Sequence, residues 1–330
     1  MKRTIAFLLT VAILAVSLVS CEDRAIGTSG YTDTVIFEET DGEETPGQES
    51  PTEETSGEET PPEETPAEET QEDVTPDTGE ILPRDPSKIY RILFIGNSFT
   101  YRNDMPTDIF RKVCESAGYK LSIQTITNGG HYLWEFASLT DEYGKRVHEA
   151  LKTKQYDIVI IQEQSGNAIA NPARFYDGVR DLAALVKENG AELWLFETWG
   201  YKEGYSKLPT HGGTTAVMEM KLRAAYSAIA EEVGASVAYV GAAMIDVHTN
   251  HPEYDLYNAD LYHPSRVGSI LAALTICASV FRCDVRDISY KGGLDAEALS
   301  ILKEAAYNAA FGDNPVDEKY MTSSVGVTKK

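Results

Sequence analysis

The sequence predicts a three-layer α/β/α domain in which helices cover both faces of a central parallel sheet. Short apolar runs, which are typical of strands buried on both faces, alternate with longer stretches of helical periodicity. The apolar runs lie at residues 91–96, 121–126, 157–161, 192–196 and 236–240. This alternation favours a sheet of about five parallel strands, because consecutive parallel strands need a crossover connection between them, usually a helix.

The stretches between and after these runs carry helix signals. Asn171 and Pro172 offer an N-cap followed by proline at the first helical position, and apolar residues then recur from Phe175 to Val186 at helical spacing. Further helices are expected at residues 106–117, 218–232, 265–280 and 295–310. Such sheets bind ligands at the carboxyl ends of their strands, so we look for chemistry in the loops that follow each strand.

Residues 1–21 have the features of a bacterial lipoprotein signal peptide. Lys2 and Arg3 precede an apolar stretch at residues 5–19, which is shorter than the roughly 20 residues of a spanning helix. The stretch ends in Leu-Val-Ser-Cys, which resembles a lipobox, so Cys21 is the expected lipidation site. We therefore expect a lipid-anchored protein of the cell envelope, outside the cytoplasm. An ordinary cleaved signal followed by a chance cysteine is the alternative.

Residues 22–87 are predicted to be a disordered acidic linker. They contain 22 acidic and two basic side chains, and Glu-Glu-Thr recurs with a period of five at residues 53–70. That period matches neither helix nor strand, and the segment has too few apolar residues to offset the entropy of ordering. We expect it to act as an expanded tether.

The charge distribution excludes nucleic acid as a partner. The formal net charge is −23, and no basic stripe is available to displace counterions from phosphates. Four cysteines in 330 residues are too few for a fold built on disulfides. We therefore expect a folded domain with an ordinary apolar core at residues 88–313 and a flexible tail at residues 314–330.

Two polar segments are candidates for chemistry. Ser98 follows the first apolar run in a tight Gly-Asn-Ser turn, where nearby backbone N–H groups can face an oxyanion. Asp260 and His263 directly precede a predicted helix, and the aspartate can hold one ring nitrogen while the other takes a proton from serine. Each segment can also be purely structural, since serines after strands are common and an Asp-His pair can cap a helix.

Together the two segments resemble the SGNH, or GDSL-type, hydrolase superfamily. The resemblance covers residues 88–311, and its nearest form has the block Gly-Asn-Ser-Phe-Thr that stands here at residues 96–100. It implies a flavodoxin-like fold with Ser98 as nucleophile, His263 as general base and Asp260 as its orienting acid. It also implies an oxyanion hole formed by the backbone N–H groups of Ser98 and of a glycine after the second strand, for which Gly130 fits better than its neighbour.

The third block departs from the family pattern. The family has Gly-x-Asn-Asp after the third strand, with the asparagine as an oxyanion donor, whereas this chain has Gln-Glu-Gln-Ser-Gly-Asn at residues 162–167. A glutamine offers the same carboxamide on an arm that is one methylene longer. Gln164 is the preferred third donor, Gln162 is the alternative, and Asn167 would require a shifted loop. Asn97 also replaces the usual aspartate, at a position outside the triad.

The resemblance implies a serine esterase for small acyl esters that requires no metal or other cofactor. We expect O-acetyl groups on carbohydrate as the substrate, because Trp134, Trp199 and Tyr201 lie in loops at the predicted active edge and can stack on sugar rings. These aromatic residues can equally pack the loops. A lipase or lysophospholipase acting on membrane lipids, or a non-catalytic relative that binds glycan, are the alternative functions.

The histidines at 248 and 251 and the remaining cysteines are weaker candidates for chemistry. His248 and His251 lie near two aspartates but lack a third ligand at zinc-like spacing, so no metal site is expected. Cys277 and Cys283 can pair in an exported protein or remain buried thiols, and Cys114 is expected in the core.

Overall fold

The sheet is the centre of the computed structural model, which describes residues 83–320. In this part of the chain five parallel strands are ordered β2-β1-β3-β4-β5, as in flavodoxin-like folds. The strands are β1 (Ile89–Gly96), β2 (Lys120–Thr127), β3 (Ile158–Ile161), β4 (Glu192–Phe196) and β5 (Ser236–Ala238). The predicted three-layer α/β/α fold is confirmed. The predicted signal peptide, Cys21 and most of the predicted linker lie outside the described residues.

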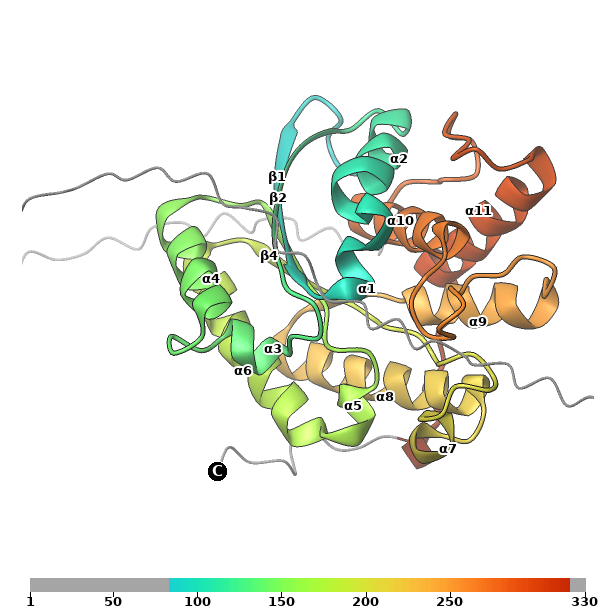
Figure 1. Ribbon diagram of the computed structural model, residues 1–330. Helices are drawn as coiled ribbons and strands as arrows, with labels where there is room; N and C mark the ends of the chain where they lie inside the picture. The colour runs from blue at the N-terminus through green and yellow to red at the C-terminus, as the bar shows by residue number, and fades with distance from the viewer. Residues whose placement is uncertain (1–82, 321–330) are drawn as a thin grey trace, which may run out of the picture. The chain divides into compact units, whose positions relative to one another are not determined.

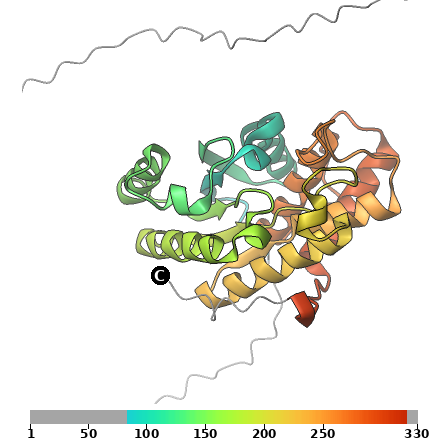
Figure 2. The same ribbon diagram turned by 60° about the horizontal axis from the view of Figure 1, so that its bottom comes forward.

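Helices cover both faces of this sheet (Figure 1). One face carries α2 (Arg111–Ser116) and α10 (Arg266–Phe281), and the other carries α4 (Glu142–Thr153), α6 (Pro172–Asn189) and α8 (Thr215–Val233). The helices α6 and α8 pack side by side in one layer (Figure 2). This division follows from right-handed crossovers, since β1 connects to β2 in one direction along the sheet and the later strands follow in the other.

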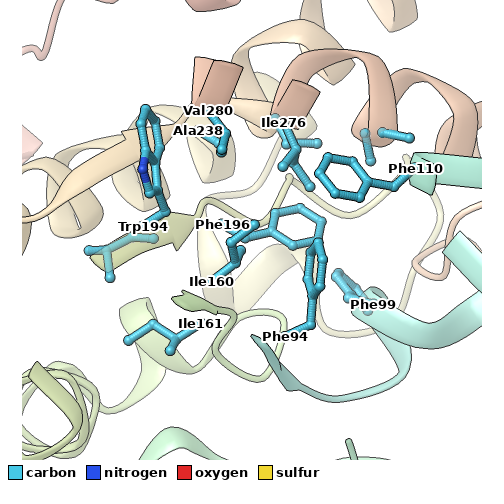
Figure 3. Close-up of a cluster of buried hydrophobic side chains, with 14 of the residues drawn as sticks. Phe94, Phe99, Phe110, Ile160, Ile161, Trp194, Phe196, Ala238, Ile276 and Val280 are labelled. Carbon is cyan, nitrogen blue, oxygen red and sulfur yellow. The ribbon is translucent and has the colours of Figure 1, made fainter. Parts of the chain in front are cut away.

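The helix α10 is buried on all sides. It lies between the sheet and an outer pair of helices, α9 (Val240–Asn250) and α11 (Ala296–Phe311), and residues 268–281 are all buried. Figure 3 shows Ile276 of α10 near Phe196 of β4 and Phe94 of β1, and Val280 of α10 beside Ala238 of β5. An apolar sequence without a polar face is typical of a helix in this position.

Several helices are present that the sequence pattern does not predict. Five of the 12 residues of α4 are charged, and its buried side chains, among them Val147 and Leu151, form only a narrow stripe. The helix α9 begins at Val240, a residue predicted to end the fifth strand, so that strand is shorter than predicted. The shorter unpredicted segments are α1 (Ser98–Tyr101), η1 (Arg102–Asp104), α3 (Leu133–Phe136), α5 (Asn167–Ala170), α7 (Leu208–His211) and η3 (Glu318–Tyr320). One more short segment, η2 (Met105–Phe110), belongs to a predicted helix.

Within residues 83–320, no helix combines the length and the apolar character needed to cross a bilayer. The predicted helix at residues 106–117 is present as the π-helical η2 followed by α2.

Candidate active site

Ser98 lies at a sharp turn between the end of β1 and the start of α1. Gly96 permits this turn, because a Cβ there would lie 2.5 Å from Thr100 Oγ1 and 2.8 Å from Gln162 Oε1. Asn97 caps α1, since its side chain accepts a hydrogen bond of 3.2 Å from the Phe99 N–H. Ser98 is therefore held at the carboxyl edge of the sheet, and it is partly exposed.

The fold brings Ser98, His263 and Asp260 into one hydrogen-bonded chain. Ser98 Oγ lies 2.7 Å from His263 Nε2, and His263 Nδ1 lies 2.7 Å from Asp260 Oδ2. The backbone N–H of His263 donates to Asp260 Oδ1 over 3.0 Å. Leu261, with a φ of 67°, turns the chain so that the aspartate faces back toward the imidazole. This geometry suits proton transfer from the serine to the imidazole.

The charge states of His263 and Asp260 suit the action of His263 as a general base. Burial lowers the pKa of His263 below its ordinary 6.5, the nearby charge of Arg102 lowers it further, and the hydrogen bond to Asp260 only partly opposes this. Burial tends to raise the pKa of Asp260, but hydrogen bonds from His263 outweigh it and hold that pKa below its ordinary 3.8. At neutral pH, His263 is therefore neutral and able to accept a proton, and Asp260 is ionised.

A pocket of about 250 Å³ opens over this chain of groups. Gly130 and Gln164, two of the predicted oxyanion donors, both line it together with Ser98. Gly130 has a φ of +72°, a conformation that glycine adopts without strain. The full lining is Asn97, Ser98, Phe99, Tyr101, Arg102, Gly129, Gly130, Gln164, Ser165, Tyr262 and His263.

Gln162 does not face the pocket, so the alternative prediction for the third donor was wrong. Its side chain is fully buried beneath the Ser98 turn. Gln162 Oε1 accepts hydrogen bonds from the Asn97 N–H at 3.0 Å and from Thr100 Oγ1 at 2.7 Å, and its amide nitrogen donates to the Glu163 carbonyl. The residue supports the turn that carries the nucleophile. Asn167, in α5, is also buried and does not line the pocket.

Glu163 is a structural residue of the site that was not predicted from the sequence. Its fully buried carboxyl group accepts a 2.6 Å hydrogen bond from the Gln164 N–H and a 3.4 Å hydrogen bond from the Leu133 N–H. Leu133 begins α3, directly after the loop that carries Gly130, so one side chain joins the two loops with predicted oxyanion donors. Burial raises the pKa of Glu163 to about 8. A charged residue two positions after a wholly apolar strand was the available signal.

Two of the three predicted stacking residues cannot contact a sugar. Trp199 is 0% exposed and stacks on Phe99 with ring centroids 4.5 Å apart. Tyr201 is 3% exposed, and its hydroxyl group is hydrogen-bonded to the Ser165 hydroxyl group. The prediction that these two rings form a binding surface was therefore wrong, because they pack beneath the pocket. Trp134 is partly exposed and is not among the residues that line the pocket. The guanidinium carbon of Arg174 lies 4.6 Å from the centroid of its ring. The role of Trp134 in binding stays a prediction.

His248 contacts a carboxylate, and the described cysteines are free thiols. His248 Nε2 lies 2.9 Å from Glu203, and among the described residues 83–320 no group of three potential metal ligands is found. The Sγ atoms of Cys277 and Cys283 are 3.9 Å apart, and both residues are free thiols, as is the buried Cys114.

Comparisons with known proteins give matches among solved structures. No protein-family model matches this chain, and no curated protein matches it. A protein from Slackia heliotrinireducens that is described as an SGNH hydrolase is 30% identical, with a TM-score of 0.52 over 58% of this chain and 100% of that chain. A DUF4886 family protein from Bacteroides uniformis is 20% identical, with a TM-score of 0.59 over 70% of this chain and 98% of that chain. The second likeness concerns the fold alone.

Proposed function

The chain belongs to the SGNH hydrolase superfamily, and we propose that it is a serine esterase that uses Ser98, His263 and Asp260 to hydrolyse small acyl esters. The observation that carries this proposal is the unbroken chain of two 2.7 Å hydrogen bonds from Ser98 through His263 to Asp260. It ends in a pocket that also exposes two predicted oxyanion donors.

The proposed mechanism is acyl transfer through a covalent intermediate. His263 Nε2 takes the proton of Ser98 as its Oγ attacks the ester carbonyl carbon, and the same imidazole then protonates the leaving alcohol. The oxyanion forms against the Ser98 and Gly130 N–H groups and the Gln164 carboxamide, whose preorganised dipoles stabilise it. A water molecule, deprotonated by His263, then releases the acid and regenerates Ser98.

We propose O-acetyl groups on carbohydrate as the substrate class. The pocket volume of about 250 Å³ suits a short acyl group with part of a sugar ring, and Tyr101, which is 40% exposed, gives its rim an aromatic face. Most lining residues are polar or glycine, which offers little apolar surface to a long acyl chain. This composition favours the esterase over the lipase alternative.

We also propose that a lipid on Cys21 anchors the enzyme to a bacterial membrane of the cell envelope, outside the cytoplasm. Residues 22–87 would then space the domain from the bilayer. This proposal is supported by the sequence pattern alone, because Cys21 and most of the linker lie outside the described residues.

The proposed function predicts that Ser98→Ala lowers acetate release from an acetylated polysaccharide by at least about 10³-fold, since removal of the nucleophile leaves only binding and the oxyanion hole. The matched control is Ser300→Ala, which alters an exposed serine on α11. Acetate release that survives the Ser98 substitution would contradict the mechanism.

Two further measurements separate the alternatives. A fluorophosphonate probe should label Ser98, and a protein that binds polysaccharide without labelling would be a non-catalytic relative. With p-nitrophenyl esters of increasing chain length, rates should fall beyond short acyl groups. Rates that rise with chain length would favour a lipase.

A further inference from the structure

Arg102 makes no bond to the reacting groups in the proposed acyl transfer, although its charge helps to lower the pKa of His263. Among the described residues that line the pocket, it carries the only permanent positive charge. Arg102 lines the pocket beside Ser98 and His263. Within residues 83–320 its Nε is buried and has no hydrogen-bond partner. Arginine is charged at every accessible pH, so a buried guanidinium N–H without a hydrogen-bond partner is unfavourable until an anion reaches it.

The backbone holds Arg102 firmly next to the reacting groups. Its N–H donates to the Ser98 carbonyl, which places it one helical turn after the nucleophile. The next residue, Asn103, has a φ of 57°, and its side chain donates to the Pro264 carbonyl at 3.2 Å and to Ser269 Oγ at 2.8 Å. Arg102 is thus fixed between the turn that carries Ser98 and the loop that carries His263.

Asp260, the carboxylate hydrogen-bonded to His263, already has hydrogen-bond donors at both of its oxygens. Both oxygens of Asp260 accept hydrogen bonds from its own loop, Oδ2 from His263 Nδ1 and Oδ1 from the backbone N–H groups of Tyr262 and His263. No aspartate or glutamate is among the described residues that line the pocket. Arg102 therefore lines a pocket whose described wall contains no carboxylate, and its charge is close enough to lower the pKa of His263.

We propose that Arg102 binds a carboxylate carried by the ester substrate, so that the enzyme acts on esters of acidic molecules, with O-acetylated acidic sugars as the favoured class. This inference rests on the proposed esterase function. A guanidinium and a carboxylate form two parallel charge-assisted hydrogen bonds, and such pairs fix orientation as well as affinity. Because Arg102 and Ser98 line the same pocket of about 250 Å³, the carboxylate must lie within about the width of a sugar ring from the scissile ester.

The carboxylate has two chemical sources. It belongs to the alcohol part in an acetylated uronic acid, and to the acyl part in a half-ester of a dicarboxylic acid. The partly exposed rim near Tyr101 favours the first source, because a sugar ring needs space outside the acyl site. Each source is tested with its own matched pair of substrates, one acidic and one neutral.

The test measures kcat/KM of the full-length protein on two substrate pairs. The first pair is an O-acetylated methyl glucuronide and the corresponding methyl glucoside, and the second is p-nitrophenyl hemisuccinate and p-nitrophenyl butyrate. We expect the wild-type enzyme to prefer the acidic member of the first pair by about 10- to 100-fold, the range of a charge-assisted pair. Preference in the second pair alone would place the carboxylate on the acyl side and contradict the favoured class.

Arg102→Gln should reduce the preference to near one, mainly through KM, and Arg102→Lys should retain part of it. Lys187→Gln is the matched control, because it removes one positive charge from the exposed last turn of α6, at the edge of the sheet opposite the pocket. The wild-type preference should also weaken as salt is raised, a measurement that needs no variant to fold.

The outcomes separate this inference from the proposed function. If the fluorophosphonate probe does not label Ser98, the proposed function fails and this inference fails with it. If Ser98 is labelled and neutral esters are cleaved with no preference for either acidic member, this inference alone fails. An equal loss on all four substrates in Arg102→Gln would overturn it too, because Arg102 would then stabilise the transition state instead of recognising a substrate group.

Discussion

The two glutamines that follow β3 illustrate how neighbouring residues of one type take different roles. Gln164 lines the pocket, whereas Gln162 lies beneath it and accepts hydrogen bonds from Asn97 and Thr100. Side chains two positions apart share a face only while the strand continues, and β3 ends at Ile161. The loop after it, held by Glu163, turns Gln164 toward Ser98 and leaves Gln162 in the core.

These positions predict that two alanine substitutions affect different properties, catalysis for Gln164 and stability for Gln162. Gln164→Ala should lower kcat by about 10²-fold with little change in KM, as the loss of an oxyanion donor does. Gln162→Ala should lower the free energy of unfolding by about 1–3 kcal/mol, since it leaves two buried donors without an acceptor. Steady-state kinetics and urea unfolding of both variants check this. Equal kinetic losses with equal stability would show that the roles are assigned incorrectly.

At the level of elements, the site depends on the close approach of α3 to α6. Gly178 lies in α6, and a Cβ at that position would lie 2.5 Å from the Trp134 N atom and 2.9 Å from the Leu133 carbonyl carbon. The backbone of α3 therefore packs directly against the Gly178 position of α6, where a side chain would otherwise stand. Because α3 follows the loop with Gly130, this contact helps to place one wall of the pocket.

Gly178→Ala should therefore destabilise the protein by about 1–3 kcal/mol, although alanine is the better helix former, because the added methyl group must displace α3. The measurement is urea unfolding, followed by kcat/KM. Ala184→Ser, at an exposed position of the same helix, is the control, with an expected change within about 0.5 kcal/mol. A stabilised Gly178→Ala variant would contradict the close approach.

At the scale of the whole molecule, burying carboxyl groups near the strand ends makes stability depend on pH. Burial raises the pKa of Glu163 to about 8 and that of Glu197 well above its ordinary 4.5. It raises the pKa of Glu219 as well, against the opposing effect of the Arg223 charge. The native state therefore holds protons that the unfolded chain has released, so stability is lost as pH rises through the native pKa values.

We predict that the free energy of unfolding falls between pH 6.5 and 8, by up to ~1.4 kcal/mol per pH unit for each such group. Above its ordinary pKa of 6.5, His263 is neutral in both states and adds no slope. Glu163→Gln should make the dependence shallower, as measured by urea unfolding at several pH values.

Asp157→Asn is the control for that experiment. Despite the opposing effect of burial, hydrogen bonds and ion pairing with Arg91 and Lys88 lower the pKa of Asp157 to about 2, so its contribution is constant throughout this window. The variant should lose stability equally at each pH and keep the slope. An unchanged slope in Glu163→Gln would rule out its titration as a cause.

Local sequence pattern determined much of this protein. Apolar runs located all five strands to within a few residues. The signal is clearest for β3 and β4, because a strand buried on both faces excludes polar side chains, whereas the edge strand β2 has only Ile126 buried. The local pattern also indicated Ser98, His263 and Asp260. Ser98 was recognisable from its place directly after a strand, and Asp260 and His263 from their spacing of three residues before a helix. Helices such as α4 were missed because their narrow apolar stripe is outweighed by charge in the sequence.

Contacts between distant segments decided the rest. Trp199 is buried because Phe99, far away in the sequence, stacks against it, and Gln162 faces inward because the Ser98 turn lies above it. Arg102 lines the pocket beside His263 because Asn103, the residue after it, is hydrogen-bonded to Pro264, far away in the sequence. Burial and pairing of a side chain depend on what the tertiary structure places beside it, and a local pattern cannot contain that information.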